Sequence, residues 1–406
     1  MTIENTSKES IAAIVGAQRD FFRSGATLDR EFRTKQLKRL LDALKEWEKP
    51  LYEALWADLH KSKEEAFLTE LSIVMGEIKN HLKHLKKWMR REKYSTPLKM
   101  TPSRSYVVSE PLGTALIIAP WNYPVQLLLN PLVGAISAGC TAVLKPSPYV
   151  PTVSKVIEQM IEANFDEKYI AVAQGNRDVN TALLEQKFDI IFFTGSPTLG
   201  KTVMEAAAKN LTPVVLELGG KSPCIVDKDA DLKIAARRIA WGKTLNAGQT
   251  CIAPDYLLIH KSLEQPFIEE FKSAIASLHG KDVKKSRHFV RLVNDRAFER
   301  VASYLTDGEV VAGGATDPPE RYIEPTLLAN VSPSAKVMQE EIFGPVLPML
   351  TFERREEVIK FITEREKPLA LYYFGEEKKG WKMVRRTSSG GVCINDTIMH
   401  IANENL

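Results

Sequence analysis

The sequence predicts an α/β protein made of two α/β domains and a small extended excursion. Short apolar runs alternate with helical stretches between residues 113 and 217, and this alternation is typical of a parallel sheet with helices on both faces. A second series of strands and helices begins near Leu218. The length of 406 residues, with 44% hydrophobic and 26% charged residues, suits a globular chain of two or three domains.

The first 93 residues are predicted to be mostly helical. Residues 31–59 and 68–93 both carry apolar side chains at the i, i+3, i+4 and i+7 spacing of an amphipathic helix. The next stretch, YSTPLKMTPSRSYVVSEPLG, is rich in proline and serine and alternates in polarity. We expect an extended excursion there, such as a hairpin, over residues 94–111.

Five buried strands are expected in the first α/β series, at residues 114–119, 141–145, 169–175, 189–194 and 213–218. Residues 111–144 hold no charged residue, a feature that would also suit a membrane span. Three prolines and the polar stretch Trp121-Asn122-Tyr123 interrupt this segment. Two buried parallel strands joined by a helix over 127–137 are therefore the better interpretation, and no membrane span is expected.

The second series predicts a further α/β domain over residues 218–392. Strands are expected at 222–228, 255–260, 308–314 and 347–352, and helices at 232–247 and 263–278. Asp231 stands where the N-cap of the first of these helices belongs.

Charge and cysteine usage exclude several classes of protein. The net charge of +4 is small and most Lys and Arg are interspersed with Glu, so nucleic-acid binding is not expected. The four cysteines (Cys140, Cys224, Cys251 and Cys393) are far apart and form no C-x-x-C pair, which argues against a zinc ribbon or a disulfide framework. The N-terminus lacks the layout of a signal peptide. We expect a cytoplasmic protein without a bound metal.

A glycine-rich stretch raises two alternatives. Gly195, Gly200, Lys201 and Thr202 fill the G-x-x-x-x-G-K-[ST] pattern of a P-loop NTPase, and Asp227 at the end of a later strand could imitate its magnesium ligand. The bulky residues at 197 and 199 do not suit a loop that wraps a phosphate. A strand, a glycine loop and a helix N-terminus would bind a dinucleotide equally well, so both interpretations stay open on this motif alone.

Three further residues are candidates for catalysis, although each also has a structural interpretation. Glu217 closes an apolar strand before two glycines, where partial loss of water can raise its pKa and make it a general base. Cys251 follows a helix in an irregular turn, NAGQTC, that could expose a reactive thiol. Asn122 lies in a polar turn after a buried strand and could donate to an oxyanion.

Seven segments taken together resemble the aldehyde dehydrogenase superfamily, especially its class 3 and fatty-aldehyde branch. They are EPLGTALIIAPWNYP, AGCTAVLKPS, FFTGSPTLGK, LELGGKSP, NAGQTCIAPDY, MQEEIFGPVLP and GGVCINDTIMHIANENL. The resemblance implies a Rossmann-like cofactor domain over 1–93 and 112–217 and a bridging or oligomerisation hairpin over 94–111. It also implies a catalytic domain over 218–392 and the start of a C-terminal segment over 393–406.

The resemblance implies oxidation of an aldehyde to a carboxylic acid with NAD or NADP, in a homodimer. Cys251 would be the nucleophile, Glu217 the general base and Asn122 an oxyanion donor. The residues implied to bind the cofactor are Trp121, Lys145, Gly195, Ser196, Gly200, Leu218, Glu341 and Phe343. Among them, Lys145 would contact the adenosine ribose, Glu341 the nicotinamide ribose, Phe343 the nicotinamide end, and Gly200 would open the helix.

The sequence departs from the family pattern in two places. Many family members carry an acidic residue three places after the ribose-contacting lysine, and Pro148 stands there. Because that carboxylate disfavours the 2′-phosphate of NADP, its loss predicts use of both NAD and NADP. The chain also ends at ENL, where the family continues with a glycine-rich turn and a pairing strand. A truncated, catalytically impaired cofactor-binding protein is therefore the alternative, and the P-loop NTPase is a distant one.

Overall fold

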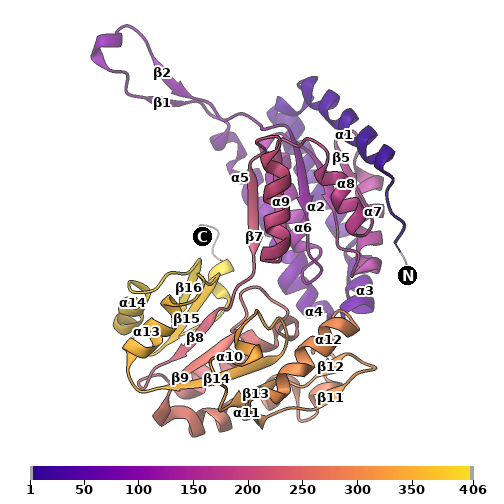
Figure 1. Ribbon diagram of the computed structural model, residues 1–406. Coiled ribbons are helices and arrows are strands. Elements are labelled where there is room, and N and C mark those ends of the chain that lie inside the picture. The colour runs from indigo at the N-terminus through magenta and orange to yellow at the C-terminus, as the bar shows by residue number, and fades with distance from the viewer. Residues whose placement is uncertain (1–2, 403–406) are drawn as a thin grey trace. The chain divides into compact units, whose positions relative to one another are not determined.

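The computed structural model describes residues 3–402, which form two compact units (Figure 1). Unit 1 comprises the chain up to residue 58 together with 63–217, and unit 2 comprises 59–62 together with the chain from 218 onward. The sequence placed the first 93 residues in one domain, yet Leu59–Ser62 belongs to unit 2. The reason lies in its contacts: Leu59 O accepts the Arg291 N–H (3.0 Å), and Ser62 Oγ lies 3.3 Å from His288 Nδ1.

Unit 1 is built on a five-stranded sheet in the order β5-β4-β3-β6-β7. Its strands are β3 (Thr114–Ile118), β4 (Thr141–Lys145), β5 (Ile170–Val172), β6 (Ile190–Gly195) and β7 (Val214–Leu218). β3 pairs in parallel with both β4 and β6, and β4 pairs in parallel with β5. Every residue of β3 and β4 is buried, as expected for a parallel sheet covered on both faces.

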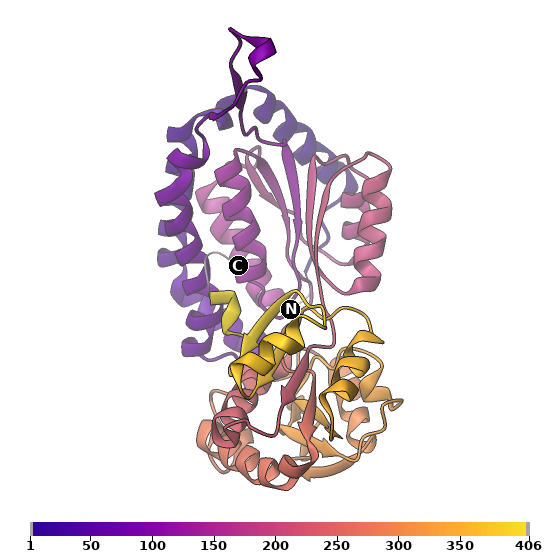
Figure 2. The same ribbon diagram turned by 90° about the vertical axis from the view of Figure 1, so that its left-hand side faces the viewer.

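Two layers of helices cover this sheet (Figure 2). The helices of unit 1 are α1 (Lys8–Arg23), α2 (Arg30–Glu46), α3 (Glu48–Leu59), α4 (Lys63–Ala66), α5 (Ser72–Trp88), α6 (Gln126–Ala138), α7 (Pro151–Asn164), α8 (Arg177–Leu184) and α9 (Pro197–Ala208). α6 packs on β3 and β4 and is covered in turn by α2 and α5. α9 packs on β6, with α8 beside it. The predicted Rossmann-like α/β arrangement is confirmed.

The uncharged stretch over residues 111–144 forms β3, α6 and β4. This confirms the interpretation as two buried parallel strands joined by a helix. α6 ends at Gly139, whose φ of 89° lies in the left-handed region that glycine adopts readily. Across residues 3–402 the structure has no helix with the length and apolar character that crossing a bilayer requires.

The excursion is a two-stranded antiparallel hairpin, β1 (Glu92–Tyr94) and β2 (Ser105–Val107). It extends away from the helices and sheet of unit 1 (Figure 1). Tyr94 and Val107 on its strands and Leu98 at its tip are exposed, with Leu98 showing 89% of its surface. Apolar side chains gathered on an exposed hairpin are typical of a surface that meets another protein.

Unit 2 contains a seven-stranded sheet in the order β10-β13-β14-β9-β8-β15-β16, in which only β10 is antiparallel to its neighbour. The strands are β8 (Pro223–Val226), β9 (Tyr256–His260), β10 (Glu309–Ala312), β13 (Thr326–Ala329), β14 (Val346–Phe352), β15 (Ala370–Phe374) and β16 (Gly391–Ile394), beside a small ladder of β11 (Thr316–Asp317) and β12 (Tyr322–Ile323). The helices are α10 (Leu232–Thr244), α11 (Glu264–His279), α12 (Asp295–Ala302), α13 (Arg355–Thr363) and α14 (Glu377–Val384).

The sequence predicted β8, β9, β10 and β14 of this sheet but not β13, β15 and β16. Every strand of this sheet except β14 is four or five residues long, and an apolar run of that length cannot be assigned to a strand or a helix by periodicity alone, so some of these strands were missed. The last four residues of the predicted C-terminal segment, 403–406, lie outside the described part of the chain. Asp231 does cap α10, since its Oδ1 accepts the Ile234 N–H (3.1 Å).

Candidate active site

Unit 1 places four predicted site residues at or just beyond the carboxyl ends of its strands. Asn122 follows β3, Lys145 ends β4, Gly195 ends β6 and Glu217 lies near the end of β7. Because the carboxyl ends of parallel strands meet at one edge of a sheet, this edge is where an open α/β fold binds its ligand. Asn122 is buried, and Trp121 beside it is half-buried.

Lys145 is a buried cation. Its Nζ donates to the carbonyl of Pro146 (2.7 Å), and burial lowers the pKa of the ammonium group to about 8. Pro148, three residues further on, is half-buried in the turn before α7. A buried ammonium group at a strand end is suited to bind a polar ligand, because each additional hydrogen bond offsets part of its lost hydration.

The strand β6 runs directly into helix α9, which begins at Pro197. Ser196 is the N-cap, with its Oγ accepting the Leu199 N–H (3.4 Å), and proline suits the first helical position. The prediction that Gly200 opens the helix is therefore wrong, because Gly200 is already buried inside it. Lys201 and Thr202 are exposed on the same helix.

This geometry leaves no phosphate-wrapping loop between Gly195 and Lys201. Only Ser196 lies between the strand and the helix, and a side chain on Gly195 would meet the ring of Phe193 at 2.6 Å. Asp227, the residue that could imitate a magnesium ligand, is bound instead by Arg355 and by the Tyr373 hydroxyl (2.6 Å). The N-terminus of α9 remains able to face a dinucleotide phosphate.

Glu217 lies on the edge strand β7, beside β6. Its side chain is exposed, yet loss of water around the carboxyl raises its pKa above the ordinary value. A carboxylate with a raised pKa that water can reach is suited to act as a general base.

In unit 2, the chain before Cys251 runs through three consecutive left-handed residues. Asn246 and Ala247 both have φ of 51°, and Gly248 has φ of 73°. The predicted helix over 232–247 therefore ends early, at Thr244. Each non-glycine residue in this conformation costs about 1–2 kcal/mol, so the surrounding structure must hold the turn. Cys251, which follows it, is half-buried.

Gln249 is the residue that holds the turn. Its Nε2 donates to the carbonyls of Asn246 (3.0 Å) and Arg291 (3.2 Å), and its Oε1 accepts the Val293 N–H (3.1 Å). Asn246 Nδ2 donates back to the Gln249 carbonyl (3.1 Å). These bonds fix the turn to Gln249, two residues before Cys251, and fix Gln249 to a separate segment of unit 2 at Arg291 and Val293.

Glu341 places its carboxylate against Gly219, directly after Leu218, and accepts the Gly220 N–H. Within the described residues its Oε1 is buried without a hydrogen-bond partner. Burial and, after it, the negative charge of Asp255 raise the pKa of Glu341 to about 8. A buried carboxyl oxygen without a partner is suited to bind a hydroxyl group of a ligand.

The nucleophile turn and the Glu341 segment meet through their backbones. A side chain on Gly248 would collide with the carbonyl of Gly344, so only glycine allows this approach. Phe343, between Glu341 and Gly344, has φ of 51°, which is an outlier for a bulky residue and is typical of functional sites. Unit 2 therefore brings Cys251, Glu341 and Phe343 into one connected region.

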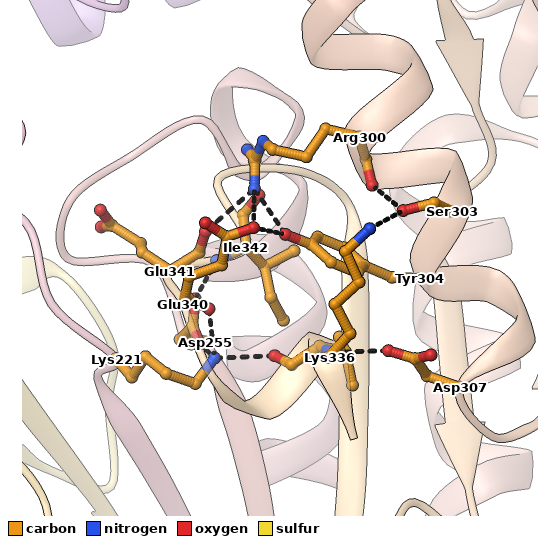
Figure 3. Close-up of polar contacts among 11 residues, drawn as sticks. Lys221, Asp255, Arg300, Ser303, Tyr304, Asp307, Lys336, Glu340, Glu341 and Ile342 are labelled. Atoms are coloured by element: carbon orange, nitrogen blue, oxygen red, sulfur yellow. Dashed lines mark hydrogen bonds and ion pairs between the residues drawn. The ribbon is translucent and has the colours of Figure 1, made fainter. Parts of the chain in front are cut away.

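A polar clamp holds the irregular segment 337–342 that carries Glu341 (Figure 3). The clamp consists of Lys221, Asp255, Arg300, Tyr304 and Asp307. Lys221 pairs with Asp255 and donates to the carbonyls of Val337 (2.9 Å) and Glu340 (2.8 Å), while Asp255 Oδ1 accepts the Ile342 N–H (2.9 Å). Arg300 donates to the carbonyls of Glu341 (3.1 Å) and Ile342 (2.8 Å).

Two more bonds complete the clamp. The Tyr304 hydroxyl donates to Glu340 Oε1 (2.6 Å), and Asp307 Oδ2 accepts the Val337 N–H (2.6 Å). Sequence reasoning missed all five clamp residues. Lys221 lies in LELGGKSP and Asp255 in NAGQTCIAPDY, so the motifs held two of them, but nothing local relates the other three to Glu341.

The predicted site residues belong to both units: Asn122 and Glu217 to unit 1, Cys251, Glu341 and Phe343 to unit 2. Over residues 3–402 there is no cluster of three or more His, Cys, Asp or Glu side chains arranged to hold a metal ion.

Comparison with known proteins gives concordant results. The family model described as "Aldehyde dehydrogenase family" matches residues 1–405. A curated relative from Staphylococcus aureus, named 4,4'-diaponeurosporen-aldehyde dehydrogenase, is 46% identical over 389 residues, covering 95% of this chain and 85% of its own length. A mouse relative, named aldehyde dehydrogenase, dimeric NADP-preferring, is 45% identical over 393 residues, covering 97% of this chain and 87% of its own.

Among solved structures, one titled as the substrate-bound state of Staphylococcus aureus AldH superposes with a TM-score of 0.96 at 45% identity. The match covers 98% of this chain and 87% of that one.

Proposed function

The chain belongs to the aldehyde dehydrogenase family, in the branch of the class 3 enzymes, and oxidises aldehydes with NAD(P); we propose that it does so through a covalent adduct on the Cys251 thiol. The observation that carries this proposal is the left-handed turn held by Gln249, which ends in a half-buried thiol. An irregular turn of this kind presents a cysteine that regular structure would bury.

The residues present fit a dinucleotide. Glu341 offers a buried carboxylate oxygen that has no partner in the described chain, and Lys145 offers a buried ammonium group. Glu341 would bind the nicotinamide ribose and Lys145 the adenosine ribose. Phe343, Trp121, Leu218 and Gly195 would line the nicotinamide side, and Ser196 would face the phosphates at the start of α9. When bound, NAD(P) accepts a hydride at its nicotinamide ring.

The first chemical step belongs to Cys251. Its thiolate attacks the aldehyde carbon, a carbon–sulfur bond forms and the carbonyl oxygen becomes an oxyanion. The Asn122 side-chain amide and the Cys251 backbone N–H donate to that oxyanion. Loss of the hydride from the former aldehyde carbon restores the carbonyl and leaves a thioester on Cys251.

Glu217 serves the second step. It accepts a proton from water, the resulting hydroxide attacks the thioester carbon, and the carbon–sulfur bond breaks to release a carboxylic acid. The raised pKa of Glu217 strengthens it as a base for this proton transfer.

A Cys251→Ser variant tests the nucleophile. We expect it to bind cofactor normally but to produce no aldehyde-dependent reduced cofactor across a panel of aliphatic and aromatic aldehydes. Normal oxidation by this variant would show that the nucleophile has been assigned wrongly. Wild-type protein that binds cofactor but oxidises no aldehyde of the panel would favour the alternative, a catalytically impaired cofactor-binding protein.

We also propose that the enzyme uses both NAD and NADP. Pro148 provides no carboxylate to repel the 2′-phosphate of NADP, and one relative is named NADP-preferring. The two values of kcat/KM should lie within about tenfold of each other, whereas a preference for NAD of about a hundredfold or more would contradict this.

A cytoplasmic location and a homodimer complete the proposal. The location rests on the separated cysteines, and the dimer on the exposed hairpin together with the relative named dimeric.

A further inference from the structure

Glu70 is a fully buried carboxylate in a π-helical turn of unit 1. The turn, Phe67–Leu71, lies between α4 and α5, and the Ser72 N–H donates to the Phe67 carbonyl across it. Glu70 has no exposed surface. Single π-turns inside helices are rare and frequently occur at functional sites, and a buried carboxylate needs strong partners to offset its lost hydration.

The partners of Glu70 lie at the start of helix α6. Its Oε2 accepts the N–H groups of Val125 (2.8 Å) and Gln126 (3.1 Å). Val125 is the N-cap of α6, and its apolar side chain cannot accept a hydrogen bond. A carboxylate from 55 residues earlier in the chain therefore caps this helix. The positive end of the helix dipole strengthens the contact.

This cap lies next to the proposed oxyanion donor. The Leu127 N–H donates to the carbonyl of Tyr123 (2.9 Å), so the first helical turn reaches the residue beside Asn122. At the other end, the Ala119 N–H donates to the carbonyl of Lys145 (3.1 Å) and fixes the chain leaving β3. The turn that carries Asn122 is thus held by the sheet on one side and by Glu70 on the other.

We propose that Glu70 is a positioning residue for the oxidation: by capping α6 it sets the orientation of the Asn122 amide toward the oxyanion. This inference rests on the proposed function of Asn122. Glu70 itself acts through Asn122 and touches no reacting atom. Because a displacement of about 1 Å can lower a rate by about 10²-fold, a loosened cap should be visible in the kinetics.

A double-mutant cycle separates positioning from mere stabilisation. The measurement is the single-turnover rate of cofactor reduction with the best aldehyde of the panel. Asn122→Ala should lower this rate by about 10²–10³-fold. Glu70→Ala should lower it by about 10–100-fold. The double variant should be close to Asn122→Ala alone, because a donor that has been removed can no longer be misplaced.

Asp58 provides a matched control. Its Oδ2 accepts the Val153 N–H (2.9 Å) in the first turn of α7, so it too is a carboxylate that caps a helix of unit 1 from far away in the sequence. Asp58→Ala should destabilise the protein, but its effect on the rate should multiply with that of Asn122→Ala. Glu70→Gln keeps an acceptor oxygen and should recover most of the rate lost in Glu70→Ala.

The outcomes distinguish the two proposals. Normal turnover by Asn122→Ala would contradict its role as oxyanion donor. If Asn122→Ala is slow and Glu70→Ala multiplies the loss, or if Glu70→Ala is as fast as wild type, the positioning role of Glu70 is wrong. Unchanged cofactor affinity and an unchanged rate of Cys251 alkylation in Glu70→Ala would show that the rest of the protein is intact. If Glu70→Ala does not fold, the same cycle is measured with Glu70→Gln. Any loss of rate in Glu70→Gln must then be absent when the substitution is made in the Asn122→Ala protein.

Discussion

A buried carboxyl group such as that of Glu341 gives the folded protein its own dependence on pH. Glu341 keeps its proton up to about pH 8 in the folded state, whereas an unfolded glutamate loses it near pH 4.3 or so. The folded state binds more protons between these values, so the free energy of unfolding should fall as pH rises through them. The charged groups that interact with Glu341 are Asp255, Lys221, Arg300 and the buried Lys243.

We predict that Glu341→Gln loses less thermal stability than wild type between about pH 5 and about pH 8. Melting temperatures of the two proteins across this interval provide the test. The buried Lys145 and Lys243, whose pKa values are both lowered to about 8, contribute above the interval. Because the charge of Glu341 acts on Lys243, the two proteins are compared below about pH 8. Equal pH dependence in both proteins would show that Glu341 is ionised in the folded state.

A second prediction at the residue scale concerns the turn before Cys251. Gln249→Ala removes three hydrogen bonds and leaves buried polar groups unpaired, which should destabilise the protein by about 1–3 kcal/mol. The strained turn should then relax and change the rate at which iodoacetamide alkylates Cys251.

Gln18 offers a matched control for Gln249. It is equally buried, in unit 1, and its Nε2 donates to the carbonyls of Ala142 (2.8 Å) and Glu167 (3.2 Å). Gln18→Ala should lose similar stability and leave alkylation of Cys251 unchanged. An unchanged alkylation rate in Gln249→Ala as well would mean that Gln249 supports the fold but not the thiol.

At the scale of elements, the clamp joins helix α12 to the segment 337–342 through Arg300. Arg300→Met leaves the carbonyls of Glu341 and Ile342 without their donor. We expect about tenfold weaker binding of reduced cofactor, equivalent to about 1.4 kcal/mol, measured by fluorescence titration. Arg296 is exposed on the same helix, and Arg296→Met should bind as wild type does. Equal affinity of the two variants for reduced cofactor would show that Arg300 does not contribute to cofactor binding.

The sequence predicted elements better than it predicted contacts. The strands of unit 1 follow from short apolar runs, and its N-terminal helices follow from the i, i+3, i+4 and i+7 spacing of apolar residues. Both patterns are local properties of the sequence. The start of α9 was misplaced because Ser196 and Pro197 make a stronger helix start than Gly200 does. Glu70 and Arg300 could not have been predicted as partners of α6 and Glu341, because those contacts span 55 and 41 or more residues of the chain. Gly248 directly follows the predicted helix over 232–247, and nothing local shows that the structure uses this glycine for a backbone contact with Gly344.

At the scale of the whole molecule, the exposed apolar side chains of the hairpin β1–β2 are not explained by the contacts of a single chain. Its apolar side chains face solvent, although the rest of unit 1 buries its own core. Within a homodimer such a hairpin would be covered by the second copy, which offsets the cost of exposing it. The small net charge of +4 does not oppose self-association.

We therefore predict that Leu98→Asp weakens the dimer. Leu98 at the hairpin tip is 89% exposed in the single chain, and a buried, unpaired carboxylate at an interface is costly. Leu211, which is 90% exposed in the turn between α9 and β7, is the matched control. Light scattering coupled to size-exclusion chromatography should show a shift toward monomer for Leu98→Asp at low concentration and none for Leu211→Asp. If both variants stay dimeric, the hairpin tip lies outside the interface; if the wild type is already a monomer, the dimer itself is refuted.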